Sequence, residues 1–167
     1  RNHGRSPHNA VMDYPSMAND VEFFLQNHDI KKASLLGHSM GGKIAMWFAL
    51  NSPDRLDKLI VADIAPISYQ HSFDNTLNAL KALPLSEIKS RKQAEMLLAT
   101  SIPELSYRQF LLQNLELKDG DYCWRIDLNI FSDTAPNIAS FPATESITPY
   151  HSDVLFIVGG DSHFVKK

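Results

Sequence analysis

One serine in this sequence lies in a pattern that suits nucleophilic chemistry. Residues 37–41 read Gly-His-Ser-Met-Gly, a Gly-x-Ser-x-Gly motif with Ser39 at its centre. A serine hydroxyl becomes a useful nucleophile when the backbone exposes it and a neighbouring base takes its proton. The motif meets the first condition when it forms the sharp strand-to-helix turn called a nucleophile elbow. A glycine-rich turn with an idle serine is the alternative interpretation.

The spacing of the two glycines has a steric reason. In an elbow the positions two before and two after Ser39 face each other, so we expect side chains at Gly37 and Gly41 to clash. The turn also aims the N–H of Met40 at the point that the serine hydroxyl reaches. There it would donate a hydrogen bond to a developing oxyanion, helped by the partial positive charge of the helix N-terminus.

The hydrophobic pattern predicts the elements that position this motif. A helix is expected over 15–28, a strand over 33–37, and a second helix that follows the motif and ends at 52–53. The apolar runs 59–62 and 154–158 are typical of strands buried on both faces of a parallel sheet. This order of strands and helices indicates an α/β fold with right-handed crossovers.

About 90 residues between these two runs have a different character. Leucines at helical spacing indicate helices near 77–83, 94–98 and 110–115, and residues 122–126 suit a short extended piece. A long, mostly helical excursion between consecutive strands is a lid, so we expect a partial core at 1–64 and 153–167 and a lid at 65–152. Its leucines either line a substrate tunnel or, more simply, pack the lid on itself and on the core.

Three motifs together resemble the α/β-hydrolase superfamily. Residues 37–43, Gly-His-Ser-Met-Gly-Gly-Lys, resemble its elbow; residues 1–6, Arg-Asn-His-Gly-Arg-Ser, resemble the segment after its fourth strand; residues 63–66, Asp-Ile-Ala-Pro, follow its sixth strand. In combination they look like the YbfF-type esterases, a bacterial group related to mitochondrial hydrolases. The resemblance implies a partial α/β-hydrolase fold, with a mostly parallel sheet, helices on both faces and a mainly helical lid between strands 6 and 7.

Two aspartates compete for the acid that orients the catalytic histidine. Asp63 is the first charged residue after the run 59–62, at the carboxyl end of a strand, where α/β sheets bind ligands. The YbfF-type group places its acid after the sixth strand, which matches Asp63. Many other members use a Gly-x-x-Asp turn after the seventh strand, where this sequence has Ser162, with Asp161 one residue early. We therefore favour Asp63 as the acid and Ser162 as a supporting hydrogen-bond partner.

The position of the catalytic histidine in the superfamily is not matched in this chain. The resemblance places it in a Gly-His pair after an eighth strand, and no such pair follows residues 165–167. His163 would be a substitute close to Asp161, and the resemblance gives His38 a packing role. We expect the base and the second oxyanion donor to lie outside this chain, which begins with Arg1. The chain would then be an internal fragment, and without the base it would be inactive. It would also be poorly soluble alone, because an apolar sheet edge stays unpaired.

The composition of the chain disfavours several classes of binding partner and cofactor. The sequence has 16 Lys and Arg against 19 Asp and Glu, so its net charge is −3. Because it also lacks a cluster of basic residues, binding to nucleic acid or to an anionic membrane surface is not expected. No apolar run is long enough for a membrane helix. Cys123, the single cysteine, forms neither an internal disulfide nor a thiolate metal site and is expected to pack. These features favour a cytoplasmic protein without a metal site or cofactor.

The predicted activity is that of a serine esterase or thioesterase. Ser39 would attack an acyl ester or thioester to form an acyl-enzyme, Met40 would hold the oxyanion, and Asp63 would orient the missing histidine. A non-catalytic binding protein of the same fold is the alternative from a different class. An acyltransferase, a C–C bond hydrolase or a haloperoxidase are alternatives within the fold, because all of them share the elbow.

Overall fold

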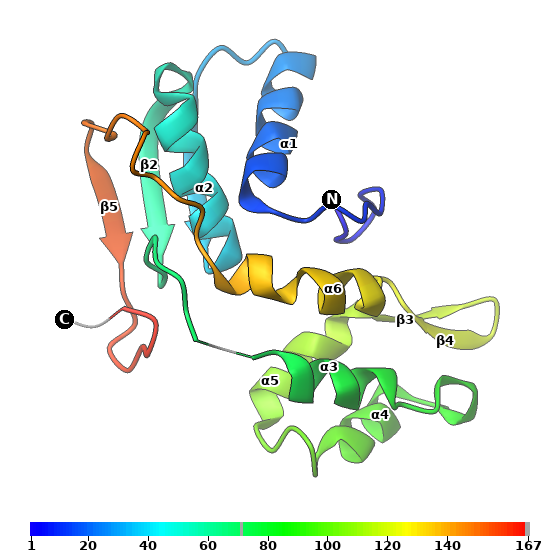
Figure 1. Ribbon diagram of the computed structural model, residues 1–167. Coiled ribbons are helices and arrows are strands. Elements are labelled where there is room, and N and C mark those ends of the chain that lie inside the picture. Colours follow the sequence, from blue (N-terminus) through cyan, green and yellow to red (C-terminus); the bar gives the residue numbers. More distant parts are fainter. Residues whose placement is uncertain (71, 166–167) are drawn as a thin grey trace. The chain divides into compact units, whose positions relative to one another are not determined.

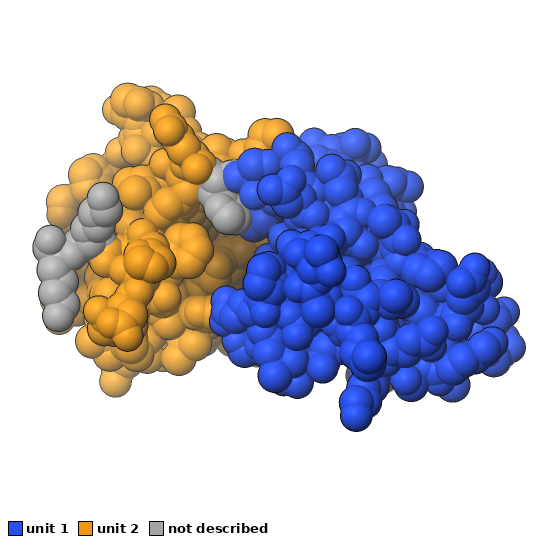
Figure 2. Space-filling model, turned by 90° about the horizontal axis from the view of Figure 1, so that it is seen from below, with its two compact units in different colours: residues 1–10, 71–135 blue, residues 11–70, 136–167 orange. Residues whose placement is uncertain are grey.

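The computed structural model describes residues 1–70 and 72–165. The chain forms two compact units, coloured separately in Figure 2. Unit 1 contains residues 1–10 and 71–135, and unit 2 contains residues 11–70 and 136–167. The predicted site residues all fall in unit 2.

Unit 2 is built on a three-stranded parallel sheet in the order β1-β2-β5. Its strands are β1 (Ala33–His38), β2 (Leu56–Ala62) and β5 (Val154–Ile157). The helices of this unit are α1 (Tyr14–Asn27), α2 (Met40–Asn51) and the short η1 (Pro53–Arg55). Helix α2 packs on β1 and β2, and α1 packs on α2, so both helices lie on the same side of the strands (Figure 1).

Local sequence explains the ends of the two helices of unit 2. The Asp13 carboxylate caps α1 by accepting the N–H of Ser16 at 2.7 Å, and Pro15 suits the first turn. Helix α2 ends at Asn51, two residues before Pro53, because a proline disfavours helical backbone just before it. The predicted helix over 15–28 and strand over 33–37 are therefore confirmed within one residue at each end. Strand β2 begins three residues earlier than the predicted run 59–62.

The sheet carries apolar side chains on both faces, as predicted, but the expected burial of both faces is seen on one only. Leu59 and Val61 belong to the core beneath α2, and Val61 is fully buried. The register places Leu36, Ile60 and Leu155 in one row across the three strands. Leu36 is 67% exposed and Leu155 is 57% exposed. The reason is that α1 and α2 both pack over the same face.

Unit 1 is mainly helical, as the pattern predicts. It contains α3 (Asp74–Lys81), η2 (Leu85–Glu87), α4 (Arg91–Leu98), α5 (Leu105–Leu111) and η3 (Leu112–Asn114). An antiparallel hairpin of β3 (Leu115–Lys118) and β4 (Asp121–Trp124) follows, and then most of α6 (Leu128–Ala139). A leucine-rich core holds the unit together, as expected for most lid leucines. The predicted third helix is wrong in its position, because Leu115 already lies in β3.

The compact units differ from the predicted core and lid in two places, so the predicted boundaries stay a prediction. Residues 1–10 group with unit 1, where the His8 ring bonds the carbonyl of Arg125 at 3.1 Å and the His3 ring contacts Phe131 edge-on. Residues 136–152 group with unit 2, and Phe141 and Tyr150 pack against its core. The division inside α6 falls at a proline, Pro136, which removes one helical hydrogen bond.

Candidate active site

Ser39 lies in the sharp turn that the motif predicts. Strand β1 ends at His38, helix α2 begins at Met40, and Ser39 between them has φ 51° and ψ −122°. A non-glycine residue in such a conformation costs about 1–3 kcal/mol and persists only where its surroundings hold it. Here the Ser39 N–H donates to the carbonyl of Ala62 at 3.1 Å, and the Ser39 carbonyl accepts N–H groups from the first turn of α2. The serine side chain is exposed.

The predicted clash of a side chain is confirmed at Gly37, and the same prediction is wrong at Gly41. A Cβ atom on Gly37 would collide with the backbone carbonyl of Gly41. A Cβ atom on Gly41 would meet nothing within 4 Å, so no clash requires a glycine at this position. The second constrained glycine is instead Gly42, where a Cβ atom would lie 2.5 Å from Cγ2 of Ile64 and 3.1 Å from the carbonyl oxygen of Gly37. The motif alone did not reveal this shift by one residue.

Met40 is the first residue of α2, so its backbone N–H has no acceptor within the helix. It follows Ser39 directly, at the helix end that carries partial positive charge. A donor in this place is suited to a developing negative oxygen beside the serine.

Asp63 follows β2 and is held by β5 and the segment after it. Its φ is 54°, and its backbone N–H donates to the carbonyl of Ile157 at 2.8 Å. The Gly159 N–H donates to Oδ1 of Asp63 at 3.0 Å, and the Ser162 side chain forms a further hydrogen bond to the carboxylate. These bonds, first that of Gly159 and then that of Ser162, hold the pKa of Asp63 below its usual value, with a smaller contribution from His38. Asp63 is therefore a carboxylate at neutral pH.

The strand register brings these residues to one edge of the sheet. His38 pairs with Ala62, and Ala62 pairs with Ile157, so Ser39, Asp63 and residues 158–162 all follow the carboxyl ends of neighbouring strands. In α/β sheets this edge is where ligands bind. The structure thus brings together Ser39, Met40, Asp63 and Ser162 as the sequence predicts. Their catalytic roles stay a prediction.

The alternative candidates for the acid and the base, Asp161 and His163, lie in an exposed turn. This exposure is expected of residues in a surface turn. His38 is also exposed within these residues, and the packing role that the resemblance implies for it stays a prediction. His38 is exposed because β1 alternates, and His38 points with Ser34 and Leu36 to the uncovered face. Cys123 is half-buried in β4, in keeping with a packing role.

Sequence reasoning missed one buried charge next to this site. Lys43, in the first turn of α2, is only 2% exposed. The sequence signal is a single lysine among the apolar and small residues 40–50 of a helix expected to face the core.

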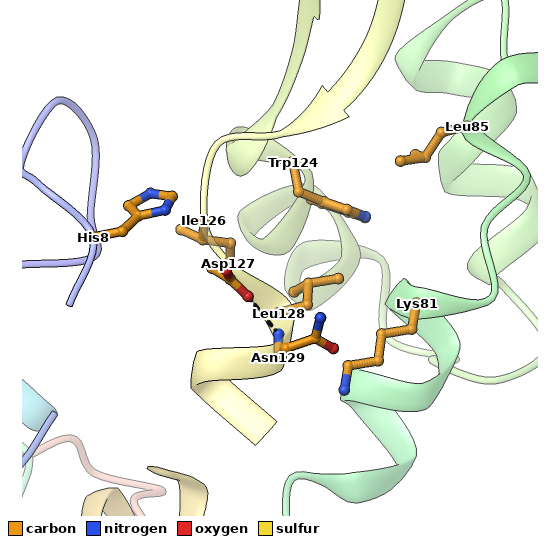
Figure 3. Close-up of a pocket in the computed structure, with 8 residues that line it drawn as sticks. All are labelled: His8, Lys81, Leu85, Trp124, Ile126, Asp127, Leu128 and Asn129. Carbon is orange, nitrogen blue, oxygen red and sulfur yellow. Dashed lines mark hydrogen bonds between the residues drawn. The ribbon is translucent and has the colours of Figure 1, made fainter. Parts of the chain in front are cut away.

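A separate hollow of about 380 Å³ lies within unit 1 (Figure 3). It combines apolar side chains, including Leu85 and Trp124, with polar ones, including His8, Lys81 and Asp127. Asp127 is occupied as the cap of α6, where its Oδ1 accepts the N–H of Asn129 at 2.8 Å (Figure 3). None of the residues that line this hollow is a predicted site residue.

The fold and the elbow define the class of protein, and comparison with known families agrees. The α/β hydrolase fold family matches residues 1–167, and the chain belongs to this family. It is 40% identical over 173 residues to the sn-1-specific diacylglycerol lipase ABHD11 of Danio rerio, covering 100% of this chain and 54% of that protein. It is 38% identical over 168 residues to esterase YbfF of Escherichia coli K12, covering 100% of this chain and 63% of that protein. The predicted resemblance to both the superfamily and the YbfF-type group is confirmed.

Solved structures support the same assignment. A marine microorganism esterase superposes with a TM-score of 0.92 at 40% identity, covering 99% of this chain and 66% of that one. The chain therefore spans about half to two thirds of the length of the relatives it matches. Among the described residues, no helix is both long and apolar enough to cross a membrane.

Proposed function

We propose that this chain carries the nucleophile and the acid of a serine hydrolase that cleaves acyl esters or thioesters. The observation that carries the proposal is Ser39, held at φ 51° and ψ −122° between a strand and a helix, with its side chain exposed. A strained, well-anchored serine is costly for a protein that merely binds a ligand. The relatives that bear the names esterase and lipase support the same class of reaction.

In the proposed reaction the Ser39 hydroxyl attacks the acyl carbonyl carbon while a histidine takes its proton. The carbonyl oxygen becomes negative and accepts the Met40 N–H. The histidine then returns the proton to the departing alcohol or thiol, which leaves an acyl group on Ser39. Water, activated by the same histidine, releases the carboxylic acid and restores the serine.

Asp63 has two tasks in this scheme, which are to orient the histidine and to stabilise its charged form. Its pKa, lowered mainly by the Gly159 N–H and by Ser162, keeps it ionised for these tasks. We expect the histidine and a second oxyanion donor outside these 167 residues, and we expect the enzyme to act in the cytoplasm.

Labelling with a fluorophosphonate probe tests the proposal in the full-length gene product. The probe reacts with an activated serine, so we expect labelling that Ser39→Ala abolishes. Ser34→Ala is the matched control, because Ser34 is an exposed serine on the strand that leads to the elbow, and labelling should persist. An unlabelled wild-type protein would instead favour a non-catalytic binding protein of this fold.

A further inference from the structure

Lys43 places a positive charge inside unit 2, where a lysine is rarely found without partners. Its ammonium group donates to the carbonyl of Ser140 at 2.6 Å and to that of Ala139 at 3.0 Å. It also lies over two aromatic rings, 4.7 Å from the ring centre of Tyr69 and 5.5 Å from that of Tyr14. Such cation–ring contacts stabilise a charge that has left water.

The two carbonyls are suitable acceptors because of where they lie. Helix α6 ends at Ala139, and the last carbonyls of a helix have no partner within it. The same helix end carries partial negative charge, which attracts a cation. Lys43 therefore caps α6 from a different helix.

The carbonyls belong to a pair of segments that hydrogen bond to each other. We call residues 65–69 and 138–141 the paired segments. The Tyr69 N–H donates to the carbonyl of Ala139 at 2.9 Å, and the Phe141 N–H donates to Oγ of Ser68 at 3.1 Å. The Tyr14 hydroxyl donates to the carbonyl of Ile138 at 2.6 Å.

Tyr69 extends this network to the segment that follows β5. Its hydroxyl accepts the N–H of Ala65 at 2.9 Å and donates to the carbonyl of Phe164 at 2.7 Å. One side chain thus links the segment after Asp63 to the segment after Ser162.

The paired segments lie in unit 2, beside two of the three places where the chain passes from one unit to the other. The chain leaves unit 2 after residue 70 and returns at residue 136. Both paired segments therefore contact one ammonium group, and that group belongs to the helix that begins at the elbow.

We propose that Lys43 is a positioning residue that fixes the paired segments, which flank residues 71–135 in the sequence, to the first turn of the elbow helix. This role goes beyond the proposed hydrolysis and does not depend on it. Lys43 would not touch substrate; it would act through the paired segments. Burial lowers the pKa of Lys43 to about 8, so the charged form still predominates at neutral pH.

Hydrogen exchange in the full-length gene product tests this proposal without any assay of activity. Lys43→Met keeps the length of the side chain and removes its charge and its donors. We expect the amides of the paired segments, Tyr69 and Phe141 above all, to exchange about tenfold faster or more, because charge-assisted hydrogen bonds are lost. Lys58→Met is the control, since Lys58 is an exposed lysine on β2. In this variant, exchange in the paired segments should stay unchanged.

A purely packing role would give a different pattern. It would accelerate exchange throughout α1, α2 and β1 to the same degree as in the paired segments, and that result would overturn the proposal, as would unchanged exchange in those segments. Lys43→Arg, which retains charge and donors, should restore most of the protection. If Lys43→Met does not fold, Lys43→Gln must still weaken protection selectively in the paired segments. Failure of probe labelling at Ser39 would sink the proposed function but leave this measurement untouched.

Discussion

At the scale of single residues, the candidate site depends on how each side chain is held. Asp63 accepts a backbone N–H and a hydroxyl from one short segment after β5. Asp161 lies in that same segment but is exposed. The role of the acid stays a prediction: the sequence favours Asp63 because it directly follows the apolar run 59–62 and matches the position of the acid in the YbfF-type group. The sequence could not predict the bond from Gly159, since that bond depends on how the chain turns after β5.

Asn substitutions separate the two aspartates. Asp63→Asn keeps the shape of the side chain but removes the charge that would orient the histidine, so we expect kcat/KM for an acyl ester to fall by about 10³–10⁴. Asp161→Asn should change it by less than about threefold, because an exposed turn residue contributes little. Steady-state kinetics of the two variants of the full-length gene product show which aspartate is the acid. A large loss for Asp161→Asn with a small one for Asp63→Asn would reverse our assignment of the acid.

Ser162 is expected to act on the pKa of Asp63. Ser162→Ala removes a donor to the carboxylate, so the pKa of Asp63 should rise towards its ordinary value. The stability that this bond contributes should be present above about pH 4, the unfolded-state pKa of an aspartate, and lost as the pH falls through the lower folded-state pKa. NMR titration of the Asp63 carboxyl carbon and urea unfolding at neutral and acidic pH measure both effects. An unchanged titration, as expected for Ser34→Ala, would show that Ser162 does not support the acid.

At the scale of elements, the strand-to-helix junction was the most predictable part of the chain. An apolar strand, a glycine, a serine and an amphipathic helix all indicate the same turn. The lid was harder to predict, because its elements are short and their ends depend on packing. Helix α6 was not predicted; it contains Pro136, which disfavours a helix, and Asp127 caps its start and stabilises it.

The two glycines of the elbow should respond in opposite ways to alanine. Gly37→Ala forces a Cβ atom into the backbone of Gly41, so we expect it to destabilise the fold by about 1–3 kcal/mol or more and to abolish activity. Gly41→Ala meets open space within a helix and should stabilise the fold by about 0.5–1 kcal/mol. Urea unfolding of both variants measures the difference. Equal destabilisation by the two substitutions would show that the junction is not built as described.

At the scale of the whole molecule, the apolar pattern of the strands predicted a sheet covered on both sides. The structure covers one side, and the row of Leu36, Ile60 and Leu155 lies on the other. The pattern reports what each strand can bury, whereas burial itself depends on which elements pack against it. For the same reason the sequence indicated two regions but not where the compact units divide.

The uncovered row predicts the behaviour of the 167-residue chain when it is produced alone. Exposed apolar patches promote association, so we expect this chain to bind the dye ANS and to aggregate. The double variant Leu36→Lys with Leu155→Lys should reduce dye fluorescence and raise the soluble yield. Ser34→Lys is the matched control, because it adds a charge on β1 without removing apolar surface. Equal improvement by the control would show that charge, and not the apolar row, limits solubility.

If Ser39 is the nucleophile, it carries an acyl group during turnover. Rapid acid quenching of the full-length gene product with p-nitrophenyl butyrate, followed by peptide mass spectrometry, tests it most directly. We expect the mass increment of a butyryl group on the peptide that contains Ser39, and its absence in Ser39→Ala. Turnover of the ester by the Ser39→Ala variant at the wild-type rate, or a butyryl group on another residue, would contradict this expectation.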